Sequence, residues 1–493
     1  MRRAPLATLL LAVLALPACV RSSRPARPSL PTVTRELLAA LEEEGALTGA
    51  LVVDAQTGLP LFSHREHVRL LPASTMKLVS TSSALATLGP DFRFVTPVLL
   101  EGTHQGPLFE GDVVVESSGD PSLGSWRFPE TVPVCEQISE ALWGRGIRQW
   151  RGALRIQAPD TDLEGPLGPG WAWDDAAYAM SAPPTPFVFR ENVVDLALAR
   201  PEGASCAEPP TVQLSPPFAT FPTTLQLDTS APKPGLSCVR ARGAPGVRCV
   251  WRSAADQCPR TASLRLSIDD PQALFTACVE DALLRKGLTR LPARVPSPNP
   301  PVPTRQSLLE LISPPLSELV KATNKESLNL YADRLGLRFA RERTGHEGFS
   351  ALRTALTEEL ARRGISPREM RPVDGSGLSR YNLATPRGLV QVLFTSLQEP
   401  YGAALSDSLP IAGVDGTLAN RRLSAQTLGR IRAKTGTLSS QKAFAGIAER
   451  PGDPEHPRVV FALMLGNMDE QPALSANDVF DRFAEALVNL PLQ

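Results

Sequence analysis

Hydrophobic residues near the start of the chain recur at spacings that predict specific elements. Apolar positions three and four apart predict a helix over residues 34–44, which Gly45 ends. Apolar runs at 49–54 and 59–62, joined by a Gln-Thr-Gly segment, predict a hairpin. A second helical pattern covers residues 74–88 and stops at a Gly-Pro pair. This succession is typical of helices packed on an antiparallel sheet.

The pattern changes at about Arg93. Short apolar runs now alternate with connections rich in proline and glycine, which predicts strands at 94–100, 112–115, 193–198 and 264–268. Every tryptophan of the chain lies in this part, and we interpret them as local core residues. The region ends at residues 292–303, where six prolines predict a stiff strap. We therefore interpret residues 93–303 as a β-rich insertion of one or two subdomains.

Helical spacing returns after the strap and completes the layers begun by the first helix. The spacing predicts helices at 307–319, from Leu328 onward, and at 352–363, 385–397 and 478–490. Strands are predicted at 431–437, 442–449 and 458–465. The predicted organisation is thus an α+β main domain, with antiparallel sheet and helices, that the insertion divides into parts at 32–92 and 304–493.

Composition narrows the possible functions. A chain of 493 residues is too long for one compact core and favours two or three domains. Lys+Arg and Asp+Glu both count 51, so the formal net charge is zero and no nucleic-acid partner is predicted. The five histidines show no metal-binding spacing, and we predict neither a metal nor a cofactor.

The first residues predict export. Arg2 and Arg3 precede an apolar run at 6–16 that is too short to span a membrane, so residues 1–19 are predicted to be a signal peptide. The sequence before Cys19 resembles a bacterial lipobox, which leaves two alternatives: lipidation of Cys19 as a membrane tether, or plain cleavage nearby. Residues 20–31 are predicted to be a polar tether. The predicted location is periplasmic or exported.

Cysteine usage agrees with an exported chain. Besides Cys19 there are six cysteines, all between Cys135 and Cys278. An even number in an oxidising compartment favours up to three disulfides over free thiols. The spacing does not fix their connectivity.

The helix predicted at 74–88 begins with a candidate nucleophile and base. Ser74 and Lys77 are three positions apart, so their side chains lie on one face of the helix, about one turn apart. Serine attacks a carbonyl only if a neighbouring group takes its proton, and lysine does so once burial or a nearby cation lowers its pKa. The alternative is a helix-capping serine followed by a surface lysine.

Two further short motifs favour the catalytic interpretation of Ser74 and Lys77 over the helix-capping one. Ser327 and Asn329 form a Ser-x-Asn sequence just ahead of the Leu328 helix, and Lys434, Thr435 and Gly436 form a Lys-Thr-Gly sequence on a predicted strand. Ser-x-x-Lys, Ser-x-Asn and Lys-Thr-Gly, in this order, are the signature of penicillin-binding proteins and class A β-lactamases. The chain therefore resembles these serine enzymes.

The resemblance is closest to the low-molecular-mass class C (type-4) penicillin-binding proteins, the D-alanyl-D-alanine carboxypeptidase/endopeptidases of serine peptidase family S13. It rests on the stretches 117–123, 325–333, 374–379, 412–418 and 433–438 and covers essentially the whole mature chain. It implies a β-lactamase/DD-peptidase-like fold with a large insertion between the first two motifs. It also implies peptidoglycan stem peptides as substrates and β-lactam antibiotics as acylating inhibitors.

The resemblance implies roles for the first two motifs. Ser74 attacks the carbonyl between two D-amino acids, and Lys77 accepts its proton. Ser327 relays a proton to the departing amine, and Asn329 holds the substrate amide. Ser327 by itself is also explained as a helix N-cap, and Leu328 departs from the aspartate of many relatives.

The third motif is implied to bind the substrate. Lys434 supplies positive charge that keeps the base neutral and attracts the terminal carboxylate, which Thr435 and Thr437 also bind. The backbone N–H groups of Thr437 and the nucleophile form an oxyanion hole. Gly436 lets the substrate backbone lie against the strand. The stretches 374–379 and 415–417 are interpreted as tight turns rather than contacts.

Two other functions remain as alternatives. A β-lactamase-like hydrolase shares the acylation residues but needs a carboxylate that activates water, for which Glu358 and Glu359 are the nearest candidates. A catalytically weak penicillin-binding or wall-binding protein is the other. The intact Ser74, Lys77 and Lys434 weigh against the second alternative.

Overall fold

The computed structural model describes residues 29–128, 133–161, 163, 167–240, 246–254, 257–292, 304–469 and 474–492. The predicted signal peptide, Cys19 and most of the tether lie outside these residues, as does the predicted strap beyond Pro292. Among the residues that the structure describes, no helix is long and apolar enough to cross a membrane.

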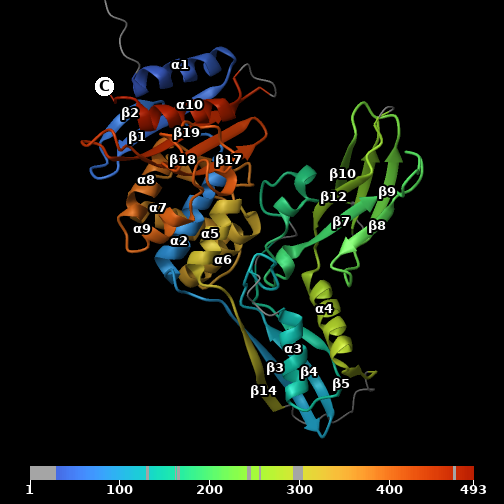
Figure 1. The fold of residues 1–493 in the computed structure, drawn as a ribbon. Coiled ribbons are helices and arrows are strands. Elements are labelled where there is room, and N and C mark those ends of the chain that lie inside the picture. The colour runs from blue at the N-terminus through green and yellow to red at the C-terminus, as the bar shows by residue number, and fades with distance from the viewer. Residues whose placement is uncertain are drawn as a thin grey trace, which may run out of the picture.

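A five-stranded antiparallel sheet forms the centre of the main domain (Figure 1). The strands come from both ends of the chain, as the apolar patterns predict. In spatial order they are β17 (Ile431–Leu438), β18 (Gln441–Glu449), β19 (Arg458–Gly466), β1 (Leu47–Asp54) and β2 (Pro60–His64). Because β17 is an edge strand, only one of its sides pairs with another strand, and on its other side Ile411 forms a single bridge with Arg432.

Helices cover both faces of this sheet, so the central strands β18 and β19 are buried almost throughout (Figure 1). Successive residues of β1 point to opposite faces: Val52 joins the core beneath α1 and α10, whereas Val53 joins the core beneath the other helices. The first face carries α1 (Leu30–Glu43) and α10 (Ala476–Asn489). The other helices are α2 (Lys77–Leu88), α5 (Leu316–Glu326), α6 (Asn329–Thr344), α7 (Phe349–Arg362), α8 (Pro386–Leu397) and α9 (Gly402–Ser408).

Local sequence explains where several of these helices begin and end. Thr385 caps α8 by accepting a hydrogen bond from the Gly388 amide at 2.9 Å, and Pro386 occupies the first turn, where no N–H is needed. Ser475 caps α10 in the same way. The helix α1 begins at the buried Leu30, two residues inside the predicted tether.

The insertion begins with a sheet that projects away from the main domain (Figure 1). Its strands are β13 (Thr289–Arg290), β5 (Gln149–Arg151), β4 (Leu108–Glu116), β3 (Val95–Gln105) and β14 (Thr304–Ile312), and β6 (Leu154–Gln157) pairs with β4. Two helices that pack together accompany it, α3 (Val134–Gly144) and α4 (Pro271–Lys286). The Cys135–Cys278 disulfide joins these helices.

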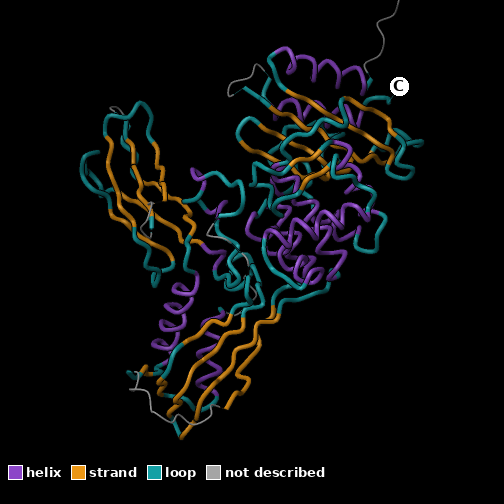
Figure 2. The backbone as a smooth tube through the Cα atoms, turned by 180° about the vertical axis from the view of Figure 1, so that it is seen from behind, coloured by secondary structure: helices purple, strands orange, loops and turns teal. Residues whose placement is uncertain are grey.

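In the remainder of the insertion the regular structure is mainly strand, joined by loops and short 3-10 turns (Figure 2). It has two three-stranded sheets, β12 (Thr261–Ser267), β7 (Val193–Ala199) and β8 (Thr211–Ser215), and β10 (Gly235–Arg240), β11 (Val247–Arg252) and β9 (Thr223–Asp228). The disulfides Cys206–Cys258 and Cys238–Cys249 lie here. Thus all six predicted cysteines are paired, and the insertion has its own hydrophobic core.

One predicted element is wrong. Residues 307–319 were expected to be helical, but they contain the end of strand β14, a short connection and the start of α5. A register shift between Ser307 and Leu309 interrupts the alternation of side chains, and both Leu308 and Leu309 pack against the core of the insertion. A β-bulge therefore imitates helical spacing. Since β14 pairs with β3, this strand belongs to the sheet of the insertion.

Candidate active site

Ser74 and Lys77 meet at the start of the buried helix. A short 3-10 turn, Ala73–Met76, carries Ser74 and leads directly into α2, whose first residue is Lys77. Lys77 Nζ donates a hydrogen bond to Ser74 Oγ at 2.9 Å. The structure thus places the hydroxyl and the amine on one face, as their spacing predicts.

Three acceptors hold the Lys77 amine. Besides Ser74, Lys77 Nζ donates to Asn329 Oδ1 at 2.5 Å and to the backbone carbonyl of Ser376 at 2.7 Å. An ammonium group has three donors, so this arrangement uses all of them. The amine therefore has one fixed direction, and it points at the candidate nucleophile.

The surroundings of Lys77 suit a base. Burial lowers the pKa of Lys77 to about 8, although the nearby carboxylates of Asp333 and Asp374 act to raise it. Burial and the charge of Asp374 in turn raise the pKa of Asp333 well above its usual range. A lysine with such a pKa loses its proton far more readily than a surface lysine does.

Lys434 has a different electrostatic state from the one expected. It is fully buried, and its Nζ donates to the backbone carbonyl of Thr435 at 2.8 Å. Burial, followed by the charge of Lys77, holds the pKa of Lys434 well below its usual range. The charge of Lys77 thus opposes protonation of the buried Lys434 amine. The expected cation at Lys434 therefore needs a bound anion to stabilise it.

The strand β17 runs directly against the backbone of Ser74. A Cβ atom at Gly436 would lie 2.5 Å from the Pro72 carbonyl oxygen and 3.1 Å from the Ser74 amide nitrogen. Glycine is thus required here because of the chain that carries the nucleophile, whereas the sequence suggested a role toward substrate. The close approach brings the Ser74 amide beside the strand that carries Thr437.

The Ser327–Asn329 segment joins two helices. Ser327 is the C-cap of α5 and has left-handed backbone angles, φ 61° and ψ 42°. Leu328, not Ser327, is the N-cap of α6, so the interpretation of Ser327 as an N-cap is wrong. Asn329 is engaged at both ends of its amide, since its Nδ2 donates to the Met180 carbonyl of the insertion at 2.8 Å. Its contacts in this structure orient Lys77 rather than expose an amide to substrate.

Residues 374–379 form a turn, as expected, but the turn also contacts the site. Its Ser376 carbonyl accepts from Lys77, and Asp333 Oδ1 on α6 accepts from the Gly375 and Ser376 amides at 2.8 and 2.9 Å. The sequence analysis missed both roles. The available signal was Asp333 itself, which lies one helical turn after Asn329 and is fully buried.

Residues 415–417, also expected to be only a turn, make contacts beside the third motif. Lys325 Nζ donates to both carboxylate oxygens of Asp415, at 2.7 and 2.6 Å. The hydroxyls of Thr417 and Thr435 lie 3.2 Å apart. This turn therefore links the residues before Ser327 to β17.

The carboxylate considered for a β-lactamase lies elsewhere. Glu359 is buried on α7, where Arg362 and Arg363 pair with it. Arg363 also donates to Ser82, two helical turns along α2 from Ser74. Glu359 therefore forms ion pairs with arginines and lies away from the nucleophile.

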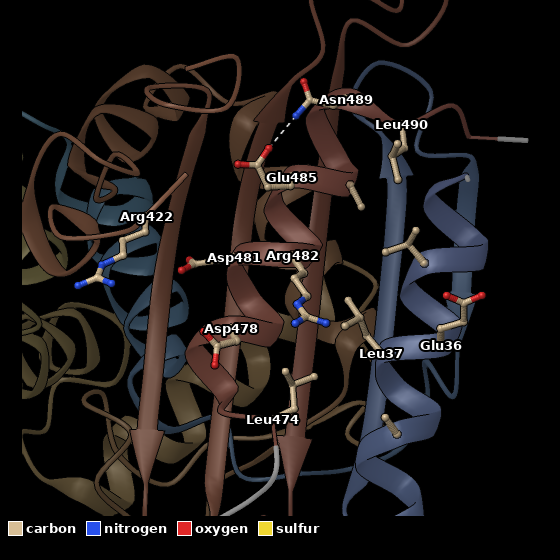
Figure 3. A pocket seen from close by; sticks show the side chains of 13 residues that line it. Glu36, Leu37, Arg422, Leu474, Asp478, Asp481, Arg482, Glu485, Asn489 and Leu490 are labelled. Atoms are coloured by element: carbon tan, nitrogen blue, oxygen red, sulfur yellow. Dashed lines mark hydrogen bonds between the residues drawn. The ribbon is translucent and has the colours of Figure 1, made fainter. Parts of the chain in front are cut away.

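A cavity near the chain termini is not part of this site. It has a volume of about 750 Å³ and lies between α1 and α10 (Figure 3). Of the acidic residues that line it, Asp481 pairs with Arg421 at 3.2 Å, and Glu485 accepts a hydrogen bond from Asn489 at 2.9 Å. The central sheet separates this cavity from α2, because the two lie against opposite faces.

The sheet between helical layers and the buried serine–lysine pair define the class of penicillin-binding serine hydrolases. Within that class, residues 34–487 match the D-Ala-D-Ala carboxypeptidase 3 (S13) family, and the chain belongs to this family.

Individual relatives agree with this assignment. The chain is 30% identical over 423 residues to a D-alanyl-D-alanine carboxypeptidase of an Actinomadura species, an alignment that covers 83% of this chain and 76% of the relative. It is 26% identical to D-alanyl-D-alanine carboxypeptidase DacB of Haemophilus influenzae, over 85% and 86% of the two chains. The crystal structure of penicillin binding protein 4 from Haemophilus influenzae has the same fold, with a TM-score of 0.78, 23% identity, and coverage of 92% and 98%.

Proposed function

We propose that the protein is a serine DD-peptidase that cleaves D-alanyl-D-alanine bonds of peptidoglycan peptides through an acyl-enzyme on Ser74. The observation that carries the proposal is the 2.9 Å hydrogen bond between Ser74 and a buried Lys77 whose pKa is about 8. Membership of the S13 family supports the substrate class. The named activity of the Actinomadura and Haemophilus relatives supports it as well.

The chemistry begins with the neutral form of Lys77. Lys77 takes the proton of Ser74 as the oxygen attacks the carbonyl carbon between two D-alanines. The C–O ester bond forms and the C–N bond breaks, while the proton held by Lys77 is relayed through Ser327 to the departing amine of D-alanine. Water then hydrolyses the ester and restores the serine. The amides of Ser74 and Thr437 stabilise the oxyanion, and loss of one such donor typically costs about 100- to 1,000-fold in rate.

The third motif is proposed to bind the terminal carboxylate of the substrate. Lys434, Thr435 and Thr437 bind it at the edge strand β17. Since burial holds the pKa of Lys434 low, an incoming carboxylate raises it again and restores the positive charge. Substrates without a free carboxylate at this position therefore bind poorly. β-Lactams present a carboxylate and a reactive carbonyl together, which makes them acylating inhibitors.

The test of this proposal is replacement of the nucleophile. Ser74→Ala is expected to abolish both covalent labelling by a fluorescent penicillin and release of D-alanine from a pentapeptide. Ser63→Ala, an exposed serine on β2, is the matched control and keeps both. Retained D-alanine release by Ser74→Ala would contradict the assignment. Rapid turnover of the penicillin, in place of a long-lived adduct on Ser74, would instead favour a β-lactamase.

The two DD-peptidase activities are separated by their products. A carboxypeptidase releases free D-alanine from pentapeptides, whereas an endopeptidase converts cross-linked dimers into monomers. Mass spectrometry of purified peptidoglycan fragments after incubation measures both. We propose an exported location, with Cys19 either lipidated or removed with the signal peptide, and the mass of the mature N-terminal peptide distinguishes the two.

A further inference from the structure

Ser327 holds a backbone conformation that non-glycine residues rarely adopt. Its φ of 61° lies in the left-handed region, at the C-cap position where glycine is usual. Such a residue is strained and persists only where the surrounding structure holds it. Because the proposed function gives the Ser327 hydroxyl a place in proton transfer, what holds this conformation matters for the reaction.

The insertion contacts the residues on both sides of Ser327. On one side, Arg127 forms an ion pair with Glu326, the residue immediately before Ser327. On the other side, the Met180 carbonyl accepts the hydrogen bond from Asn329 at 2.8 Å. Two separate segments of the insertion thus reach the same turn of the main domain.

The position of Arg127 is fixed by a second carboxylate, that of Glu191. Its Nε donates to Glu191 Oε1 at 2.7 Å, so one guanidinium bridges the two carboxylates. The buried Glu191 also accepts from Ser125 Oγ at 2.7 Å and from the hydroxyl of Tyr331, on α6, at 3.3 Å. This network connects the insertion to α6 two residues after Asn329.

Glu191 lies in a second strained segment. Arg190, Glu191 and Asn192 have φ values of 49°, 57° and 53°, three consecutive non-glycine residues in the left-handed region. The buried Asn192 stabilises this turn, since its Oδ1 accepts from the Phe189 amide at 3.0 Å and its Nδ2 donates to the Pro183 carbonyl at 2.8 Å. The turn places the Glu191 carboxylate where it meets Arg127. The two ion pairs of Arg127, with Glu191 and with Glu326, therefore join one strained turn to the other.

We propose that Arg127 and Glu191 are positioning residues that hold Ser327 in its left-handed conformation for proton transfer. Neither residue touches the reacting atoms, and both act through Glu326 and the turn that follows it. The inference rests on the proposed function of Ser327. It gives the insertion a part in the reaction, beside the main-domain contacts that Lys325 and Asn329 make on either side of Ser327.

The test compares arginines that share one neighbour. Arg127 and Arg265 both lie over the Trp126 ring, at 5.4 and 4.2 Å from its centroid, but Arg265 pairs with Asp195 and not with the Ser327 turn. Arg127→Ala is expected to slow acylation by a fluorescent penicillin, and kcat on a D-alanyl-D-alanine peptide, by about 10- to 100-fold with KM changed less than about twofold. Arg265→Ala keeps the wild-type rate. Arg127→Lys, which retains the charge facing Glu326, restores part of the loss.

A second variant keeps the test decisive if Arg127→Ala folds poorly. Glu326 is half-exposed, so Glu326→Gln is tolerated by the fold and is expected to slow acylation in the same direction. The double variant Arg127→Ala/Glu326→Gln should acylate no more slowly than Arg127→Ala, since both substitutions break the same ion pair. Wild-type acylation rates in Arg127→Ala and Glu326→Gln overturn the inference, as do equal losses of rate and melting temperature in Arg127→Ala and Arg265→Ala. A wild-type protein that no penicillin labels overturns the proposed function itself.

Discussion

The main domain and the insertion are stabilised in different ways. The sheet of the main domain lies between two helical layers, and buried apolar residues fill both of its faces. The insertion divides its strands among one six-stranded and two three-stranded sheets around a core of its own, and it contains all three disulfides found among the described residues. The main domain has apolar cores on both faces of its sheet, whereas the insertion has its elements linked covalently as well, which restricts its unfolded state.

The comparison shows which region sets the geometry of the active site. The groups that touch Ser74 or Lys77 sit on elements of the main domain: α2, α6, β17 and the turn at 374–379. The insertion reaches the site through a few polar contacts, such as Met180 with Asn329. The two regions also carry separate optical probes, because all six tryptophans lie between Trp126 and Trp251. Tryptophan fluorescence therefore reports mainly on the insertion, and through Trp171 also on its contact with Asp374 and Phe349 of the main domain.

The largest expected effect concerns the longest disulfide loop. Cys135 and Cys278 are 143 residues apart, and in the chain-entropy account their link contributes about 5 kcal/mol to the free energy of unfolding of the insertion. Cys135→Ser/Cys278→Ser should lower the denaturation midpoint followed by tryptophan fluorescence. The control is Cys238→Ser/Cys249→Ser, which opens a separation of only 11 residues and is expected to cost about 3 kcal/mol. Equal losses in the two variants would contradict the loop-length argument.

The insertion was also the part that the sequence described least. Its strand character could be predicted from short apolar runs, but the order of its strands could not. The parallel pairing of β11 with β9 and the return of β14 to β3 join segments that no local pattern connects. The bulge at Ser307 to Leu309 shows the same limit, because pairing decides which face each side chain takes.

The second largest expected effect follows from replacing a glycine in the main domain. A Cβ at Gly436 would meet the Pro72 carbonyl and the Ser74 amide, so Gly436→Ala should push β17 away from the nucleophile. Displacement of this order typically costs about 100-fold in rate, and we expect that loss in the acylation rate constant with fluorescent penicillin. Gly235→Ala on β10 is the matched control, because no atom lies within 4 Å of its added Cβ. An unchanged acylation rate in Gly436→Ala would show that β17 does not set the geometry of Ser74.

More of the active site than of the insertion could be predicted from sequence. Ser74, Lys77 and the strand of Lys434 are identified by short motifs whose spacing reflects local helix and strand geometry. Asp333 and the Ser376 carbonyl were missed, because a lone buried carboxylate and a backbone acceptor leave little signal in a sequence. The low pKa of Lys434 was missed as well, since it depends on burial that only the folded chain reveals.

The smallest expected effects come from helix caps, one in each region. Asp270 caps α4 in the insertion by accepting from the Ala273 amide at 2.9 Å, and Ser475 caps α10 in the main domain by accepting from the Asp478 amide at 3.2 Å. Loss of either cap typically costs about 1 kcal/mol. If the two regions unfold separately, Asp270→Ala shifts only the fluorescence transition, and Ser475→Ala shifts only the loss of penicillin labelling on heating. If each variant shifts both transitions together, the contacts between the regions make them one cooperative unit, and their separate stabilisation is disproved.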